Sequence, residues 1–80
     1  MILKNRRVLI TGASRGIGAA IARRFAAEGA ALFIVARSPR ELEKIALETG
    51  ANFDLCDVTQ PGEIEAVCRR AGPVDVLVHN

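Results

Sequence analysis

The sequence predicts an α/β fold in which a parallel β-sheet is covered by helices on both faces. Four short apolar runs alternate with three longer segments whose apolar residues recur every three or four positions. The connections between them are short and rich in Gly, Pro, Ser and Thr. Strands that alternate with helices along a chain form right-handed crossovers and a parallel sheet. The expected order is therefore β-α-β-α-β-α-β.

The first two strands flank the first helix. The apolar, β-branched run Arg7–Thr11 predicts a strand that is buried on both faces. The segment Gly16–Glu28 has a helical period, and Gly29 is placed to end it. The run Ala31–Ala36 predicts the second strand. The stripe expected to face inward on the helix consists of Ile17, Ile21 and Phe25.

The second helix has clear signals at both ends. Ser38 is placed as its N-cap, and Pro39 as its first residue. Glu41 follows Ser38 by three positions, which is the spacing of a capping box. Gly50 ends the helix. The residues expected to face inward are Leu42, Ile45, Ala46 and Thr49.

The last third of the chain predicts a strand, a helix and a strand. Asn52–Asp57 is the third strand, and Thr59 is expected to cap a helix with Pro61 in its first turn. Gly72 ends this helix, and Val74–Val78 is the fourth strand. The residues expected to face inward on the helix are Ile64, Val67, Cys68 and Ala71.

Composition indicates one small globular domain. The chain has 80 residues, of which 50% are hydrophobic and 25% are charged. Net charge is +2, but residues 1–40 carry +7 and residues 41–80 carry −5. A basic half is compatible with an anionic partner, although we expect Arg6, Arg7, Arg23 and Arg24 to belong to a charged N-terminus and a solvated helix face. With three Phe and no Trp or Tyr, a nucleic-acid surface is not supported.

The chain carries no targeting or membrane signal. The apolar run Val8–Ile10 is far too short for a signal peptide, and no stretch reaches the roughly 18 apolar residues of a membrane span. Cys56 and Cys68 are too few for a disulfide framework, so we expect buried, reduced thiols. These features predict a cytoplasmic protein. No residue pattern predicts a metal site.

The segment Thr11–Gly18 is the main functional signal. It reads T-G-A-S-R-G-I-G and lies where the first strand ends and the first helix begins. A helix N-terminus offers unpaired N–H groups and a positive dipole end, so it binds phosphate. Glycines allow a tight turn and close approach of a pyrophosphate. The spacing G-x-x-x-G-x-G differs from a P-loop because no Lys-Ser/Thr follows the last glycine.

Three elements together resemble the short-chain dehydrogenase/reductase family. The loop is similar to its T-G-x-x-x-G-x-G turn. Cys56–Thr59 resembles its Asp-Val element after the third strand, and Asp75–Asn80 resembles the fourth strand leading into its Asn-Asn-Ala-Gly motif. The resemblance covers all 80 residues. It implies a Rossmann-type, doubly wound sheet of strand order 3-2-1-4, incomplete here, with residues 1–80 as the N-terminal part of a single NADP(H)-binding domain.

The resemblance also implies roles for individual residues. Asp57 would accept a hydrogen bond from the adenine amino group, and the Val58 N–H would meet a ring nitrogen. Asn80 would line the ribose side. His79 stands where the family more often has the first Asn of its motif, and its position at the strand end predicts a structural role. Asp57 could also be a simple charge near the third helix. The glycine loop would hold the pyrophosphate through Gly12, Ser14, Arg15, Gly16 and Ile17, with Gly18 packing the helix against the sheet.

The end of the second strand favours NADP(H) over NAD. An NAD-specific domain places a carboxylate there to bind the ribose 2′-hydroxyl. Here the residues are Arg37 and Ser38, which also belong to the cofactor site. Arg37, with Arg15 on the other side, is placed to bind a 2′-phosphate. The alternative is that Arg37 is a solvated loop residue.

Catalytic residues are not expected in this chain. The family uses a Ser and a Tyr-x-x-x-Lys pair, and this sequence contains no Tyr. The resemblance implies a parent oxidoreductase that acts on a small carbonyl or alcohol and forms a homo-oligomer. We expect these residues alone to be inactive and marginally stable. Two alternatives remain open: a non-catalytic NADP-sensing module, and, less favoured because its cofactor lacks phosphate, a Rossmann-like methyltransferase.

Overall fold

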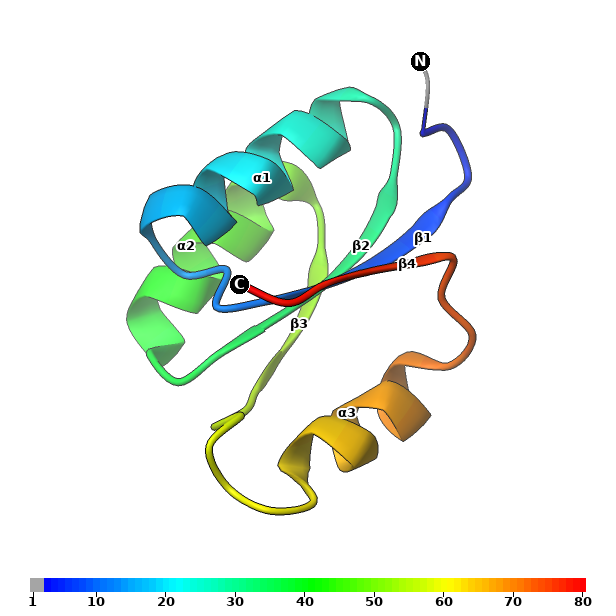
Figure 1. Cartoon of the computed structure of the whole chain (residues 1–80). Coiled ribbons are helices and arrows are strands. Elements are labelled where there is room, and N and C mark those ends of the chain that lie inside the picture. Colours follow the sequence, from blue (N-terminus) through cyan, green and yellow to red (C-terminus); the bar gives the residue numbers. More distant parts are fainter. Residues whose placement is uncertain (1–2) are drawn as a thin grey trace.

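Four parallel strands form one sheet with the order β3-β2-β1-β4, as the sequence predicts. The computed structural model describes residues 3–80. Figure 1 shows the alternation of strands and helices along the chain. The elements are β1 (Arg7–Thr11), α1 (Gly16–Ala27), β2 (Ala31–Ala36), α2 (Pro39–Thr49), β3 (Asn52–Leu55), α3 (Glu63–Ala71) and β4 (Val76–Val78).

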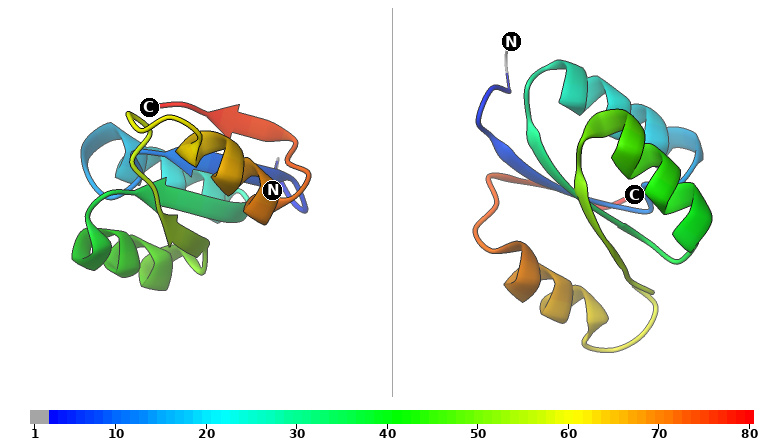
Figure 2. Two further views of the ribbon diagram at one scale, coloured as in Figure 1. Left: turned by 90° about the horizontal axis from the view of Figure 1, so that it is seen from below. Right: turned by 180° about the vertical axis from the view of Figure 1, so that it is seen from behind.

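The helices lie on both faces of the sheet. Helices α1 and α2 lie side by side on one face, and α3 lies on the other (Figures 1 and 2). β1 is central and pairs with both β2 and β4, so that Leu9 lies opposite Phe33 on one side and Leu77 on the other. Because all strands are parallel, the segments that follow them meet at one edge of the sheet.

Alternate side chains of β1 and β2 enter two separate cores. Val8, Ile10 and Ile34 pack against α1 and α2, whereas Leu9 and Val35 pack on the α3 side with Val67. All six of these side chains are fully buried. Burial on both faces explains why β1 and β2 read as continuous apolar runs, and it confirms the prediction made for Arg7–Thr11.

The inward face of α1 differs from the expected stripe. Ile17 is 72% exposed, and Ile21 and Phe25 are only partly buried. The buried residues are Gly18, Ala19 and Ala22. Helix α1 approaches β1 so closely that small residues must face the sheet. The prediction that Ile17 faces the sheet is therefore wrong, and the first turn of α1 buries Gly18 and Ala19 instead.

The start of α3 also differs from the prediction. Thr59 does not cap it: the helix begins at Glu63, after Gly62 in a left-handed conformation with φ of 82°. Thr59 instead hydrogen-bonds the side chain of Asp57. Val67 and Ala71 are buried as expected, Ile64 is half-buried and Cys68 is exposed. A helix of 9 residues on one face of the sheet buries only a narrow stripe.

Both outer strands are shorter than expected. β3 ends at Leu55, and the chain turns away after the Cys56 N–H has donated to the Ala36 carbonyl at 2.9 Å. β4 begins at Val76 because Asp75 uses its side chain to bind the backbone of β1. Its carboxylate accepts from the Arg7 N–H at 2.8 Å, and its own N–H donates to the Arg7 carbonyl at 2.7 Å.

The beginning of α2 lies where the sequence predicts it. Ser38 is the N-cap residue, Pro39 is the first helical residue and Gly50 follows the helix with φ of 75°. The predicted capping box does not form, because the Ser38 side chain makes no capping hydrogen bond. Glu41 instead pairs with Arg15 of the glycine loop, with 3.8 Å between the Arg15 Nε and a carboxylate oxygen.

Surface arginines of α1 are paired with carboxylates. Arg23 binds Glu48 of α2 at 2.8 Å, and Arg24 binds Glu28 at 3.2 Å. These exposed pairs agree with a solvated helix face for Arg23 and Arg24, whereas Arg7 lies in β1. Over residues 3–80, no helix is both long and apolar enough to cross a bilayer. The same residues contain no cluster of His, Cys, Asp and Glu suited to a metal ion.

Candidate functional site

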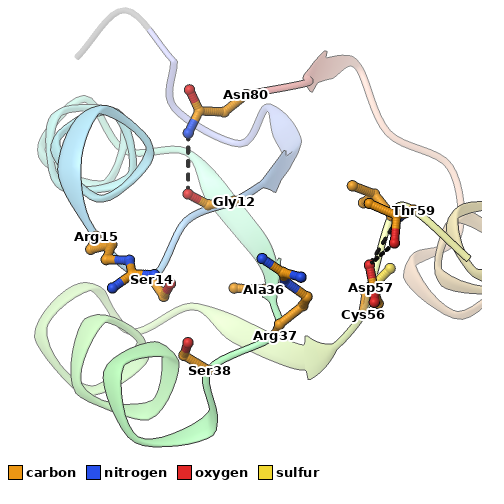
Figure 3. A pocket seen from close by; sticks show the side chains of 11 residues that line it. Gly12, Ser14, Arg15, Ala36, Arg37, Ser38, Cys56, Asp57, Thr59 and Asn80 are labelled. Atoms are coloured by element: carbon orange, nitrogen blue, oxygen red, sulfur yellow. Dashed lines mark hydrogen bonds between the residues drawn. The ribbon is translucent and has the colours of Figure 1, made fainter.

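A pocket of about 340 Å³ opens at the carboxyl edge of the sheet. Three loops meet there, following β1, β2 and β3, and the end of the chain after β4 closes one side (Figure 3). Its lining consists of Gly12, Ser14, Arg15, Ala36, Arg37, Ser38, Cys56, Asp57, Val58, Thr59 and Asn80. The pocket therefore brings together eight of the eleven site residues predicted from the sequence.

The glycine loop has a backbone that most residues could not adopt. Gly12 and Gly16 have positive φ angles of 62° and 61°. Gly18 lies so close to the loop that a Cβ there would be 2.1 Å from the Gly12 carbonyl oxygen. Gly18 is thus the contact that sets α1 against the strand end, the packing position that the sequence indicated. Gly16, Ile17 and Gly18 do not line the pocket.

The N-terminus of α1 is open to an anion. Arg15 occupies the N-cap position and cannot accept a hydrogen bond, so the first N–H groups of the helix have no side-chain cap. The first turn carries no acidic residue. Unpaired N–H groups and the positive dipole end together favour a bound negative charge at this point.

The residues after β4 contact the glycine loop, Thr11–Gly18, through hydrogen bonds. The Asn80 side-chain amide donates to the Gly12 carbonyl at 3.2 Å, and the Asn80 N–H donates to the Thr11 hydroxyl at 3.0 Å. His79 Nδ1 lies 3.3 Å from the same hydroxyl. His79 therefore has a contact within the fold, which supports the structural role expected for it. The loop and the end of β4 form one hydrogen-bonded unit.

Asp57 is held at the far side of the pocket by a turn. Its carboxylate accepts from the Thr59 hydroxyl at 2.6 Å and from the Thr59 N–H at 3.0 Å. These hydrogen bonds, with a smaller contribution from the charge of Arg37, lower the pKa of Asp57 below its ordinary value. The Asp57 N–H donates to Glu63 at 2.9 Å, which joins the turn to α3. Asp57 thus stays ionised at neutral pH and presents an acceptor to the pocket.

Two arginines approach the pocket from different loops. Arg37 follows β2, and its guanidinium extends between the glycine loop and the Asp57 turn (Figure 3). Arg15 lies on the other side, beside Ser14 (Figure 3). Each has an acidic neighbour, because Arg15 pairs with Glu41 and the charge of Arg37 acts on Asp57. The arrangement suits a doubly charged anion, which can engage both guanidinium groups.

Three lining residues were not predicted from the sequence. Ala36 ends β2, Cys56 directly follows β3 and Thr59 orders the Asp57 side chain. Ala36 and Cys56 could have been inferred from position alone, because the last residues of parallel strands border the crevice at the carboxyl edge. Thr59 was assigned to a helix cap, and that assignment concealed its role at the pocket.

The two cysteines are predicted to differ sharply in reactivity. Cys56 is buried, and burial, followed by the charge of Glu63, raises the pKa of its thiol. The reactive thiolate is therefore scarce at pH 7, whereas Cys68 is exposed. Under iodoacetamide we expect Cys68 to be alkylated at least about tenfold faster, as measured by mass spectrometry. Denaturant should equalise the two rates, and equal rates in the native chain would contradict the burial of Cys56.

Similarity to known proteins extends over nearly the whole chain. Residues 6–80 match the sequence model of the family described as short chain dehydrogenase. The chain is 45% identical over 74 residues to a cyclic-di-GMP-binding biofilm dispersal mediator protein of Escherichia coli K12, covering 91% of this chain and 31% of that protein. It is 41% identical over 86 residues to the 3-oxoacyl-[acyl-carrier-protein] reductase FabG of the same strain, covering 100% of this chain and 35% of FabG.

Solved structures share the fold of this chain. A crystal structure of BdcA in complex with NADPH superposes with a TM-score of 0.94 at 40% identity, over 100% of this chain and 33% of that chain. The chain thus spans about a third of the length of the relatives that it matches. With the family match over residues 6–80 and the Rossmann-type sheet, the chain belongs to the short-chain dehydrogenase/reductase family of oxidoreductases.

Proposed function

We propose that residues 1–80 are the N-terminal part of an NADP(H)-binding domain in an oxidoreductase that interconverts a small carbonyl compound and an alcohol. The observation that carries the proposal is the pocket itself. It combines an open helix N-terminus, two arginines and an ionised carboxylate at the carboxyl edge of a parallel sheet. The NADPH bound to BdcA and the reductase activity named for FabG support it.

The residues of the pocket divide between the two ends of the dinucleotide. Asp57 and Val58 would hold adenine, and the glycine loop with its open α1 N-terminus would hold the pyrophosphate. Asn80 would line the ribose side. Bound NADPH supplies the hydride. This chain's part is to bind and orient the cofactor, because it contains no Tyr to serve as the family's proton donor.

Preference for NADP(H) rests on the residues that follow β2. Arg37 occupies the position at which a carboxylate would select NAD, and it borders the pocket together with Arg15 and Ser38. A charge-assisted hydrogen bond to a phosphate contributes about 1.5–3 kcal/mol, whereas the uncharged 2′-hydroxyl of NAD offers no such interaction. Two arginines therefore suffice for a preference of one or more powers of ten.

Replacing Arg37 tests the cofactor assignment. We expect Arg37→Ala to weaken NADP binding about 10- to 100-fold and to change NAD binding little, as measured by calorimetric titration of both dinucleotides. Arg40→Ala is a matched control, because Arg40 is an exposed arginine of α2 that does not line the pocket. An unchanged ratio of NADP to NAD affinity in Arg37→Ala would refute the assignment.

A second function, binding without catalysis, has one specific point in its favour. The related biofilm dispersal mediator is named for binding cyclic-di-GMP and not for a reaction. Cyclic-di-GMP also carries phosphates that an open helix N-terminus and arginines could engage. Competition discriminates between the two: NADP displaced by cyclic-di-GMP would favour a sensing module, whereas selective NADP binding favours the reductase.

A further inference from the structure

We propose that Glu41 is a specificity-determining residue that limits the preference for NADP by competing for Arg15. The inference rests on the proposed NADP(H) site and adds to it a residue that does not line the pocket. Glu41 lies in the first turn of α2, and Arg15 precedes α1. Their contact joins the two helices that border the phosphate-binding side of the pocket.

The Glu41 carboxylate lies beside the arginine but does not line the pocket. Its oxygen lies 3.8 Å from the Arg15 Nε, while Arg15 itself lines the pocket and Glu41 does not. The Arg15 side chain is 76% exposed and that of Glu41 is 47% exposed. The guanidinium is therefore free to turn either towards Glu41 or towards an anion in the pocket, and the two positions compete.

Charge decides the direction of the effect. Exposed ion pairs contribute little to stability, so Glu41 does not hold Arg15 rigidly. A carboxylate next to the guanidinium still offsets its positive charge, and an anion bound to Arg15 would lie within about one Debye length, roughly 8 Å, of it. Both effects weaken the binding of the 2′-phosphate of NADP. NAD has no 2′-phosphate, so its binding is not weakened in this way. Glu41 therefore reduces the discrimination between the two cofactors.

The competing possibility is that Glu41 orients Arg15 for the phosphate. In that case removal of the carboxylate would weaken NADP binding. The capping role expected for Glu41 would predict no effect on the cofactor ratio at all, and the Ser38 side chain makes no capping hydrogen bond in the structure. The three roles thus predict a rise, a fall and no change in NADP preference.

Glu41→Gln in the full 80-residue chain tests the proposal. Calorimetric titration with NADP and with NAD, in parallel with the unsubstituted chain, should show an NADP-to-NAD affinity ratio raised about three- to tenfold. The increase should shrink as salt is added, because screening weakens the competition. Glu43→Gln is the matched control, since Glu43 is an exposed residue of the same helix and forms no ion pair within residues 3–80.

A second arm asks whether Glu41 acts through Arg15. In an Arg15→Ala background, Glu41→Gln should change the ratio much less than it does alone. A full effect without Arg15, an unchanged ratio or a lowered ratio would each overturn the proposal. If the unsubstituted chain binds neither dinucleotide, the proposed function fails as well. If it binds NADP but the substitution leaves the ratio unchanged, only the role of Glu41 is lost.

Discussion

Gly18→Ala is expected to destabilise the chain by about 3 kcal/mol and to abolish dinucleotide binding. The added Cβ would lie 2.1 Å from the Gly12 carbonyl oxygen and 2.8 Å from the Asn80 side-chain nitrogen. The backbone carbonyl and the hydrogen-bonded amide cannot shift without a large loss of stability, so α1 must move away from the sheet. That movement would separate the open helix N-terminus from the end of β4.

The measurement is urea denaturation followed by far-ultraviolet circular dichroism, because the chain contains no Trp or Tyr. Gly16→Ala is the matched control. Gly16 also has a positive φ, of 61°, but among residues 3–80 no atom beyond its chain neighbours and its own helix backbone lies within 4 Å of the position of its Cβ. Only the left-handed backbone opposes alanine there, at about 1–2 kcal/mol. Equal losses in the two variants would contradict the steric role of Gly18.

Ile34→Ala is expected to remove about 2–5 kcal/mol of unfolding free energy. Ile34 is fully buried at the centre of β2, in the core beneath α1 and α2. A core of this size supplies only roughly 3–5 kcal/mol in total, so the variant should be largely unfolded. Circular dichroism at low temperature should show loss of helical signal, and an added dinucleotide should restore part of it by binding the folded form.

Leu47→Ala removes a comparable amount of apolar side chain from a different environment. Leu47 is 86% exposed on α2, so the change should alter stability by no more than about 0.5 kcal/mol. The comparison separates burial from hydrophobicity as such. A similar loss in both variants would show that the outer face of α2 is packed in solution and that the assignment of the core is wrong.

The lining of the pocket was largely predictable because it depends on strand ends. Arg15, Arg37 and Asp57 each follow a strand, and parallel strands bring such positions together at one edge. The sequence predicted capping roles for Thr59 and Glu41, and both predictions were wrong for the same reason. A cap is a local hypothesis, and in the fold each side chain found a partner beyond its own helix terminus: Asp57 for Thr59 and Arg15 for Glu41.

The sequence alone determined the fold class, the order of elements and the position of the glycine loop. These follow from periodicity and from glycines at required positions, which act over a few residues. The tertiary structure alone decided that Ile17 faces solvent while Gly18 faces the sheet, that Cys68 is exposed, and that Glu41 reaches Arg15. Each of these depends on how closely a helix approaches its neighbour, and that distance is set by contacts between residues far apart in the chain.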